Sequence, residues 1–567
     1  MKILRVNMSN LEVNIQDLPV DWTIIGGRGL CAKILKAEVP PQCDPLGPEA
    51  KLIITTGPLA GTLAPSCGRI SVGAKSPLTL GIKEANSGGT AGQKMDRLGI
   101  RAIIVEGMPQ EGKMHLLHIT KDGAVLKPAD QYRGLKNYAL TEALYEKFDP
   151  KSSIASIGIG GERRWKSSSV AFTDTLGHPA RHAARGGLGA VMGSKGLKAI
   201  ILDDRGAKAV DMVDMKAHRE LIKEWAKVIK ADPKTKGTRT YGTPGLLNGL
   251  RTLGSTPSKN YSSEPTEGFE KLGGESIEKT NQERGGGLKG CMAGCLVQCS
   301  TVYYGPDGQY LTSGFEYETL GLLGTNLGIT DPDAVARFDR WCDEMGVDTI
   351  EIGSALGVAA SAGKMTFGDI ASADTLFAEI EKGTEFGSIL ADGVVSTCKA
   401  LGITRIPAYK GQAIPAHDPR VTKATGVTYV TSPMGADHTA GVTYENLSAK
   451  SGHVELSLKV QITNALLDTL GYCVLATIAD GKAQMVFLRD LLNARYGLNL
   501  EVDDLYNMGR DVLRTELEFN KGTEFYSAYD PDSDFMRTEP SAPMGTVFDV
   551  DPDEIAVIWE KLDTIAM

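Results

Sequence analysis

The sequence has no run of Lys and Arg interleaved with aromatic residues, and its 567 residues carry a net charge of -9. Surfaces that bind nucleic acid are usually basic, so this composition excludes DNA and RNA as expected partners. No apolar run reaches the length of a membrane span, and the alternating stretch from Met1 to Ser9 has no apolar core of the kind that a secretory signal needs. We therefore expect a cytoplasmic protein without a membrane span.

Two nucleotide-binding signatures are also missing, because no glycine-rich stretch matches the Walker A motif or the dinucleotide fingerprint in a strand context. The sequence does contain three glycine-rich stretches, at 26–29, 86–89 and 184–195. Their backbone N–H groups could bind phosphate, with positive charge from Arg69, Arg185 and Lys195. Each could equally be a simple turn, so none identifies a ligand alone.

The chain changes character near residue 210. Residues 1–210 read as short strands separated by glycines, with a hairpin signal at Asp122 and Gly123. From 211 onward helical periodicity dominates. We predict an α+β protein, with a β-rich cofactor-binding domain at 1–210 and two mostly helical domains at 211–415 and 416–567. The predicted helices are 211–231, 331–343, 372–382, 448–470, 482–496 and 502–521, with loops near 233–290 and 400–447.

Three of the nine cysteines, Cys291, Cys295 and Cys299, fall within nine positions behind a run of glycines. A metal centre needs thiolates that converge and a backbone that can wrap closely around them. On a straight helix these thiols would spread over roughly 12 Å, which is long for one cluster. We therefore expect Gly290 and Gly294 to curl the segment into a loop.

A fourth ligand is needed, and Cys473 is the most eligible residue. A grouping of three cysteines plus one favours an iron-sulfur cluster, because structural zinc sites usually have two close pairs. Zinc and three buried core cysteines remain the alternatives. The other five cysteines are scattered and show no disulfide framework; they are Cys31, Cys43, Cys67, Cys342 and Cys398.

One short repeat is visible: residues 343–348 and 468–473 share the pattern Asp-x-x-Gly-apolar-(Asp/Cys) at predicted helix ends. Asp343 and Asp468 could each accept hydrogen bonds from ring N–H groups, and Gly346 and Gly471 would let the backbone approach a flat heterocycle. Two ordinary glycine-terminated helices would give the same pattern.

Taken together, these motifs resemble the aldehyde ferredoxin oxidoreductase family of tungsten enzymes, over nearly the whole chain. The segments that match are 26–30, 68–79, 86–89, 184–195, 315–319, 343–348, 416–420, 435–438 and 468–473. The resemblance implies a tungsten, or molybdenum, bis-pterin cofactor beside one [4Fe-4S] cluster. In the family the tungsten takes no ligand from the protein, which agrees with the cysteine count.

The resemblance also assigns cofactor contacts. It implies that Asp343 and Asp468 each hold one pterin ring system, with the backbone around Tyr472 assisting. The residues that it implies around the pterin phosphates are Arg69, Asn86, Gly88 and Ala184. The carbonyls of Asn86 and Ala184 would then face a bridging Mg²⁺.

The implied reaction is oxidation of an aldehyde, with water, to a carboxylic acid. Glu318 is the candidate to activate or orient the attacking water, and His438 the candidate to donate to the carbonyl oxygen or pass the proton on. Glu316 competes with Glu318, because strand alternation would point both the same way. A related pterin enzyme with a non-aldehyde substrate, or an iron-sulfur subunit without pterin, is the alternative function.

Three differences from the family pattern indicate a divergent branch. The cluster motif is C-x3-C-x3-C, where the better-known aldehyde enzymes have C-x2-C-x3-C. Position 440 is Ala, where some relatives have Lys, and the last residues lack the family's aromatic tail. The chain shows no second cluster motif, so we expect electrons to leave to a ferredoxin or to a dedicated iron-sulfur subunit. A homo-oligomer and a hetero-oligomer are both open.

Overall fold

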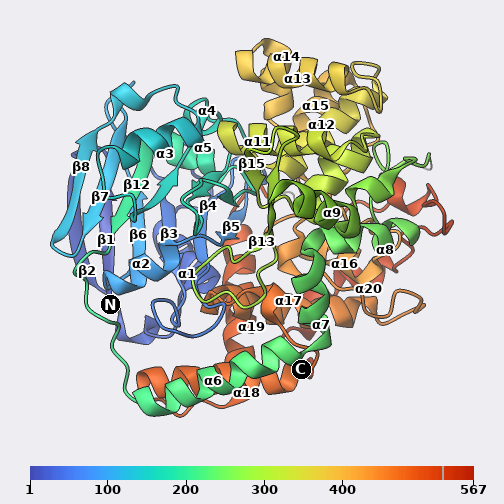
Figure 1. Ribbon diagram of the computed structural model, residues 1–567. Coiled ribbons are helices and arrows are strands. Elements are labelled where there is room, and N and C mark those ends of the chain that lie inside the picture. Colours follow the sequence, from blue (N-terminus) through green and yellow to red (C-terminus); the bar gives the residue numbers. More distant parts are fainter. Residues whose placement is uncertain (263, 526–528) are drawn as a thin grey trace.

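The computed structural model describes residues 1–262, 264–525 and 529–567. The strands of the N-terminal part lie at one side of the molecule and most of the helices at the other (Figure 1). The strands form two six-stranded sheets. The first sheet has the order β2 (Glu12–Asp17), β1 (Lys2–Asn7), β6 (Ile100–Glu106), β3 (Leu52–Thr56), β4 (Ile70–Lys75), β5 (Ile82–Ser87). The second has the order β8 (Gly123–Pro128), β7 (His115–Thr120), β12 (Leu197–Asp203), β9 (Ser153–Ser156), β10 (Val170–Phe172), β11 (Arg181–Ala183).

The two sheets share one topology. β1 pairs in parallel with β6, and β7 pairs in parallel with β12, while every other neighbouring pair is antiparallel. Both parallel pairs also shift register near the start of a strand, between Lys2 and Ile3 and between Leu197 and Ala199. The N-terminal domain is therefore an internal duplication at the level of structure.

Helices fill and cover this duplicated unit. α2 (Ala91–Arg97) and α5 (Leu188–Ser194) precede the last strand of each half and share one apolar core with both sheets. α1 (Gly27–Glu38) packs on the first sheet, and α3 (Asn137–Tyr145) occupies the corresponding place in the chain of the second half. The apolar runs of the central strands account for this burial, since strands covered on both sides are apolar throughout.

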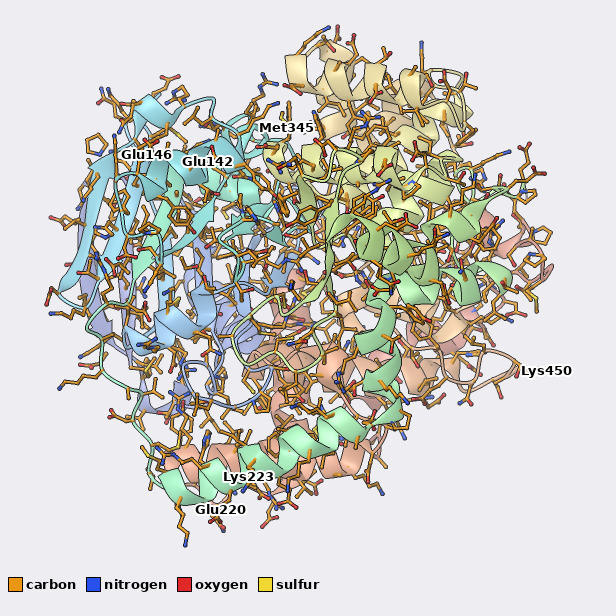
Figure 2. The ribbon with its side chains drawn as sticks, in the orientation of Figure 1. Glu142, Glu146, Glu220, Lys223, Met345 and Lys450 are labelled. Carbon is orange, nitrogen blue, oxygen red and sulfur yellow. The ribbon has the colours of Figure 1, made fainter. Side chains whose placement is uncertain are left out.

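A small three-stranded sheet follows, made of β13 (Gly287–Lys289), β14 (Ser300–Tyr304) and β15 (Tyr310–Ser313). Helices around it form a second core with α10 (Tyr317–Thr319). These helices are α11 (Pro332–Met345), α12 (Thr349–Ser361), α13 (Ile370–Lys382), α14 (Glu385–Ala391) and α15 (Val394–Leu401). Met345, at the end of α11, lies where the helices meet the sheet domain (Figure 2).

The last part of the chain is also helical. Its helices are α16 (Lys423–Thr431), α17 (His453–Leu470), α18 (Gly481–Tyr496), α19 (Val502–Asn520) and α20 (Pro552–Ala556). α6 (Met215–Ala231) runs beside α18 (Figure 1), with the rings of Trp225 and Phe487 stacked at 4.1 Å. α17 and α19 pack on α1, which itself packs on the first sheet. The C-terminal helices therefore contact the half of the N-terminal domain that contains this sheet.

The predicted α+β class and β-rich N-terminal domain are confirmed. The hairpin at Asp122 and Gly123 is confirmed as the turn between β7 and β8. All six predicted helices occur, but the first begins at Met215 rather than at 211, and α17 begins at His453 rather than at 448. The two predicted loops are wrong in part, because they contain α7 (Pro233–Tyr241), α8 (Leu247–Thr252), α9 (Gly274–Arg284) and α16. α16 is buried on all sides and has no amphipathic pattern, so tertiary packing decided its structure.

Among the described residues, no helix combines the length and apolarity that a membrane crossing requires. All nine cysteines are free thiols. The five cysteines outside the proposed cluster set are buried, as expected of scattered core cysteines without a disulfide framework.

Candidate active site

The three clustered cysteines lie in the loop between β13 and β14. Gly294 has a φ of +75°, a conformation that favours glycine, so the chain turns there. The N–H of Gln298 donates to Sγ of Cys295 at 3.3 Å. The expectation that this segment is a loop is confirmed, because Cys291 and Cys299 occupy its two ends rather than one helix face.

Cys473 joins this loop from a distant part of the chain. It follows α17, and its N–H donates to the carbonyl of Ser66 at 2.9 Å. The N–H of Ser66 in turn donates to the carbonyl of Gly294 at 3.2 Å. The segment around Ser66 therefore ties the fourth cysteine to the loop that holds the other three.

The four thiols lie close enough to influence one another. Burial raises the pKa of Cys473, and the nearby thiol of Cys291 raises it further. Burial likewise raises the pKa of Cys299, again with contributions from Cys291 and Cys473. A hydrogen bond with Cys291 lowers the pKa of Cys295, the only half-buried member. The structure thus brings together all four predicted ligands.

Within residues 1–262, 264–525 and 529–567, no three His, Cys, Asp or Glu side chains are placed to hold a single metal ion. A [4Fe-4S] cluster spreads its thiolates more widely than one zinc ion does, because each thiolate binds a different iron atom. The [4Fe-4S] cluster stays a prediction from the grouping of three cysteines plus one.

Two arginines lie near the cysteines, Arg181 buried and Arg69 half-buried. Burial alone would lower the pKa of Arg69, but Cys473, Cys291 and Asp468 raise it. Burial also opposes the charge of Arg181. Glu316 and Cys291 nonetheless raise its pKa. Positive charge is therefore fixed beside the thiols, where it would stabilise an anionic cluster.

The two Asp-x-x-Gly segments end two helices in the same way. α11 ends at Gly346 with φ +69°, and α17 ends at Gly471 with φ +65°. The next N–H reaches back to a carbonyl of the last turn in both: Val347 to Cys342 at 3.0 Å and Tyr472 to Leu467 at 2.9 Å. Both are left-handed glycine caps of the Schellman type.

The Asp468 end contacts the first half of the N-terminal domain. Nδ2 of Asn86 donates to Oδ1 of Asp468 at 3.0 Å, and Nη1 of Arg28 is 3.6 Å from Oδ2. Arg69 donates from its backbone to the carbonyl of Gly471 at 3.1 Å and from its side chain to the carbonyl of Asn86 at 3.0 Å. Asp468, Asn86 and Arg69 therefore form one connected set.

The Asp343 end contacts the second half. Nε2 of His182 lies 3.0 Å from Oδ1 of Asp343, and Nδ2 of Asn137 donates to the Asp343 carbonyl at 2.8 Å. Each helix end thus faces one of the duplicated sheets. That each of these helix ends holds one of two similar ligand halves stays a prediction from the sequence repeat.

The remaining predicted cofactor residues are Gly88, Ala184 and Tyr472. A Cβ added to Gly88 would lie 2.8 Å from Sγ of Cys291, so Gly88 backs directly onto the cysteine loop. Ala184 is half-buried just after β11. The ring of Tyr472 turns away toward Trp225, so only its backbone faces the Asp468 end.

Glu316 and Glu318 do not point the same way, so the strand alternation predicted for them is wrong. Residues Tyr317–Thr319 form α10, a single helical turn with Glu316 at its N-cap. Glu316 pairs with Arg181 at 2.9 Å, toward the cysteines. Glu318 instead accepts from the N–H of Ala416 at 2.7 Å.

Two histidines surround Glu318. Nε2 of His417 lies 2.9 Å from Oε1, and Nε2 of His438 lies 3.9 Å from the same oxygen. Burial opposes ionisation, but His438, His417 and the Ala416 N–H outweigh it and lower the pKa of Glu318 to about 2. Burial lowers the pKa of His438 despite the charges of Glu318 and Asp437. An ionised carboxylate beside a neutral imidazole is suited to accepting and donating protons.

Comparison with known proteins agrees with this geometry. Residues 3–204 match the model of the aldehyde ferredoxin oxidoreductase N-terminal domain, and residues 220–546 match that of its domains 2 and 3. The chain belongs to the aldehyde ferredoxin oxidoreductase family.

Similar family members include the tungsten-containing aldehyde ferredoxin oxidoreductase of Pyrococcus abyssi, 33% identical over 92% of this chain and 88% of that protein. The WOR-like subunit of an aliphatic sulfonate oxidoreductase of Pyrococcus furiosus is 28% identical, over 77% of this chain and 74% of that protein. A chain in the active site complex BamBC of benzoyl coenzyme A reductase, bound to 1,5-dienoyl-CoA, has the same fold. Its TM-score is 0.82 at 19% identity, over 100% of this chain and 94% of that one.

The site has polar atoms that fit the family's pterin cofactor. Nη1 of Arg28, Oδ2 of Asp468 and Oε1 of Glu84 are buried and have no hydrogen-bond partner among the described residues. Such atoms are costly unless a ligand satisfies them. Burial and the charge of Asp468 raise the pKa of Glu84 to about 8, so Glu84 could itself donate a hydrogen bond there.

Sequence reasoning missed several residues of this site. Arg28 lies in a glycine-rich stretch but was not singled out; it forms a buried bidentate pair with Glu516 at 2.8 Å. His417 lies in the family segment 416–420, which was the one available signal. Arg185 was noted only as positive charge, and its guanidinium donates to the carbonyls of Ala436 at 2.6 Å and Ala413 at 2.7 Å.

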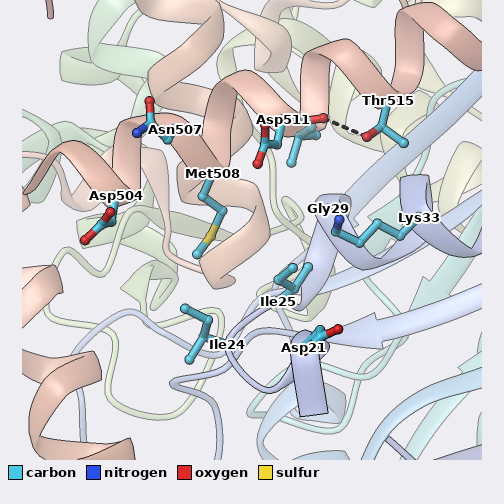
Figure 3. A pocket seen from close by; sticks show the side chains of 11 residues that line it. Asp21, Ile24, Ile25, Gly29, Lys33, Asp504, Asn507, Met508, Asp511 and Thr515 are labelled. Carbon is cyan, nitrogen blue, oxygen red and sulfur yellow. Dashed lines mark hydrogen bonds between the residues drawn. The ribbon is translucent and has the colours of Figure 1, made fainter. Parts of the chain in front are cut away.

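A cavity of about 290 Å³ lies between α1 and α19 (Figure 3). Ile24, Ile25 and Lys33 line one side, and Met508 and Asp511 the other. None of the predicted site residues lines this cavity. It is therefore separate from the candidate active site.

Proposed function

We propose that this protein oxidises an aldehyde, with water, to a carboxylic acid, and passes two electrons through a [4Fe-4S] cluster to a ferredoxin or an iron-sulfur subunit. The observation that carries the proposal is the half-buried Glu318 carboxylate, 3.9 Å from His438. The names of the relatives that are about 33% identical support the same reaction.

The proposed cofactor is a tungsten or molybdenum bis-pterin with a bridging Mg²⁺. Asp343 and Asp468 would each bind one ring system, assisted by the backbone at Tyr472. The residues proposed to surround the phosphates are Arg69, Asn86, Gly88 and Ala184, with the carbonyls of Asn86 and Ala184 facing the Mg²⁺. When bound, this group supplies the two-electron redox centre.

Glu318 would take a proton from the attacking water at Oε1. That oxygen is buried and has no well-aligned hydrogen-bond donor among the described residues, so it can accept one. His438 would donate to the aldehyde oxygen or carry the released proton away. Its side chain is 23% exposed, so part of the ring is open to a substrate.

The proposed electron path starts at the Asp468 end. Cys473 follows Asp468 by five residues, and Arg69 is close to both. One helix end would thus touch a pterin and the cluster, which gives electrons a short route. Cys295, the half-buried thiol, lies toward the surface where an acceptor could approach.

A non-aldehyde substrate is the second candidate, and the 28% identity to the sulfonate oxidoreductase subunit favours it. A third, an iron-sulfur subunit without pterin, is opposed by the unpartnered buried atoms of Arg28, Glu84 and Asp468.

The test is metal and pterin analysis of anaerobically purified protein, followed by an aldehyde panel with a viologen dye. We expect four iron atoms, one tungsten or molybdenum, and aldehyde-dependent dye reduction. Metal and pterin without aldehyde activity would support the second candidate, and iron alone the third. With substrate but no partner, NAD should not be reduced, because the chain has no dinucleotide fingerprint.

A further inference from the structure

His417 lies between Glu318 and Tyr444. Its Nε2 is 2.9 Å from Oε1 of Glu318, and its Nδ1 is 3.4 Å from the hydroxyl of Tyr444. Its ring stacks on that of Tyr317, with centroids 4.9 Å apart at 26°. The side chain of His417 is 3% exposed, so its ring has little freedom to turn.

The backbone next to His417 holds the other carboxylate oxygen. The N–H of Ala416 donates to Oε2 of Glu318 at 2.7 Å. The hydroxyl of Tyr317 donates to the carbonyl of Ala416 and also bonds Oγ1 of Thr256 at 2.9 Å. The N–H of Ala416 therefore holds Oε2 of Glu318, and the ring of His417 lies against Oε1 without a well-aligned hydrogen bond.

His438 is placed differently. Its Nε2 is 3.9 Å from Glu318, beyond hydrogen-bond distance, and its side chain is 23% exposed against 3% for His417. His417 is therefore enclosed beside the carboxylate, whereas His438 is more distant from it and more exposed.

We propose that His417 is a positioning residue that holds Glu318 ionised and correctly oriented, so that His438 remains free to contact the substrate. This assignment rests on the proposed function, because the proposed function gives Glu318 its role as proton acceptor. Tyr444 and Tyr317 would fix the His417 ring in turn. The lowered pKa of Glu318 agrees in direction: the charge of His438 lowers it most, and His417 lowers it next.

Other groups also face Glu318 and have to be kept constant in any test. Arg185 adds positive charge near it. The remaining titratable neighbours are His438, Tyr261, Tyr317, Tyr429 and Tyr444. Substituting His417 alone leaves all of these in place.

The first experiment compares His417→Leu with His417→Gln, which keeps an N–H donor. We expect His417→Leu to lower kcat/KM for aldehyde oxidation by about 10²-fold, because Glu318 is no longer held in place. The acid limb of its pH profile should move up by at least about one pH unit, since Glu318 loses a favourable partner. His417→Gln should show smaller changes in both, and His118→Gln, in β7, should show neither.

The second experiment needs no cofactor. The chain is labelled with ¹³C at the glutamate carboxyl carbons, and the Glu318 signal is identified by its loss in Glu318→Gln. The signal is followed from pH 8 down to the lowest pH at which the chain stays folded, and the wild-type signal should leave the carboxylate position only as the pH approaches 2, because the pKa of Glu318 is about 2. In His417→Leu the same change should occur at least about one pH unit higher.

An unchanged Glu318 titration together with an unchanged pH profile in His417→Leu would reduce His417 to a packing residue and overturn the proposal. If the wild-type enzyme oxidises no aldehyde, the proposed function fails, but the carboxyl titration still decides the role of His417. If His417→Leu does not fold, Tyr444→Phe replaces it. Tyr444→Phe removes only the hydroxyl beside Nδ1 of His417. A smaller shift of the Glu318 titration in the same direction supports the proposal. No shift of that titration in either Tyr444→Phe or His417→Gln refutes the proposal.

Discussion

Gly57 packs so closely against Leu470 that a methyl group on Gly57 would overlap the Leu470 carbonyl oxygen. Gly57 directly follows β3, and Leu470 is the last residue of α17. The second half of the molecule repeats the contact, because a methyl group on Gly158, just after β9, would overlap the carbonyl of Met345 at the end of α11. Each Asp-x-x-Gly helix end is therefore seated on a glycine of its own sheet.

Gly57→Ala and Gly158→Ala should each push one helix end away from its sheet. We expect a loss of about 1–3 kcal/mol in unfolding free energy, the usual cost of overpacking, and less bound pterin per chain. Gly249→Ala is the matched control, since it lies exposed in α8 with no atom near its added Cβ and should stabilise by up to about 1 kcal/mol. Thermal unfolding and pterin analysis measure both effects. If Gly57→Ala and Gly158→Ala both had the unfolding free energy and the pterin content of the wild type, the contact between helix end and glycine would not be tight.

Glu318→Gln should leave iron, tungsten and pterin contents unchanged, because Glu318 contacts none of the proposed cofactor ligands. Turnover should fall by about 10² to 10⁴, the usual range for a lost acid-base group. Glu316→Gln is the control, because Glu316 pairs with Arg181 near the cysteines rather than with the histidines. Normal turnover in Glu318→Gln would remove the carboxylate from the mechanism.

Cys473→Ser should disturb the cluster and electron transfer together, because serine is a poor ligand for iron. Tungsten should remain, since in the family it is held by the pterin dithiolenes. Iron analysis, the visible absorption of the cluster and dye reduction are the measurements. Cys67→Ser is the control: Cys67 is buried nearby but donates to the carbonyl of Pro65 at 3.4 Å and belongs to no ligand set. Equal iron contents in the two variants would exclude Cys473 as a ligand.

Lys410 should make the stability of the protein depend on pH. It borders a cavity of about 320 Å³, and its Nζ donates to the carbonyls of Thr431 at 2.9 Å and Ser432 at 3.0 Å. Burial lowers its pKa from 10.5 to about 7. Between these values the unfolded chain binds a proton that the folded chain does not, so the contribution of Lys410 to stability rises with pH.

Lys410→Met removes this dependence. Its stability relative to wild type should be highest below about pH 7 and should fall by about 2–4 kcal/mol as the pH rises toward 10.5. Chemical denaturation at pH 6.5 and pH 9.5 measures the difference. Lys450→Met, at the exposed loop tip labelled in Figure 2, should differ little from wild type at either pH. A constant difference for Lys410→Met would show that Lys410 stays charged in the folded protein.

Features that depend on a few neighbouring residues could be predicted from the sequence. The hairpin was predicted from Asp122 and Gly123, and the two left-handed helix ends from Gly346 and Gly471. Such turns need backbone angles that these residue types adopt easily. The loop around Gly294 followed from the same chemistry. The family resemblance added the candidate site residues, which the structure brings near one another.

The duplicated sheets could not be predicted, because β1 to β6 and β7 to β12 share strand order and pairing rather than an obvious sequence repeat. The same holds for Gly57 and Gly158. Nothing in their local sequence shows that a helix end from elsewhere in the chain will press against them.

By itself, then, the sequence determined the left-handed glycine ends, the cysteine loop, the hairpin and the change from strands to helices, because local backbone freedom and side-chain periodicity control these. Only the tertiary structure separated Glu318 from Glu316, since one helical turn at Tyr317 replaced the expected strand. It also brought His417 to Glu318, 99 residues away in sequence, and tied Cys473 to the loop through Ser66. Those contacts depend on how distant helices and sheets bury their apolar faces together, which no local pattern records.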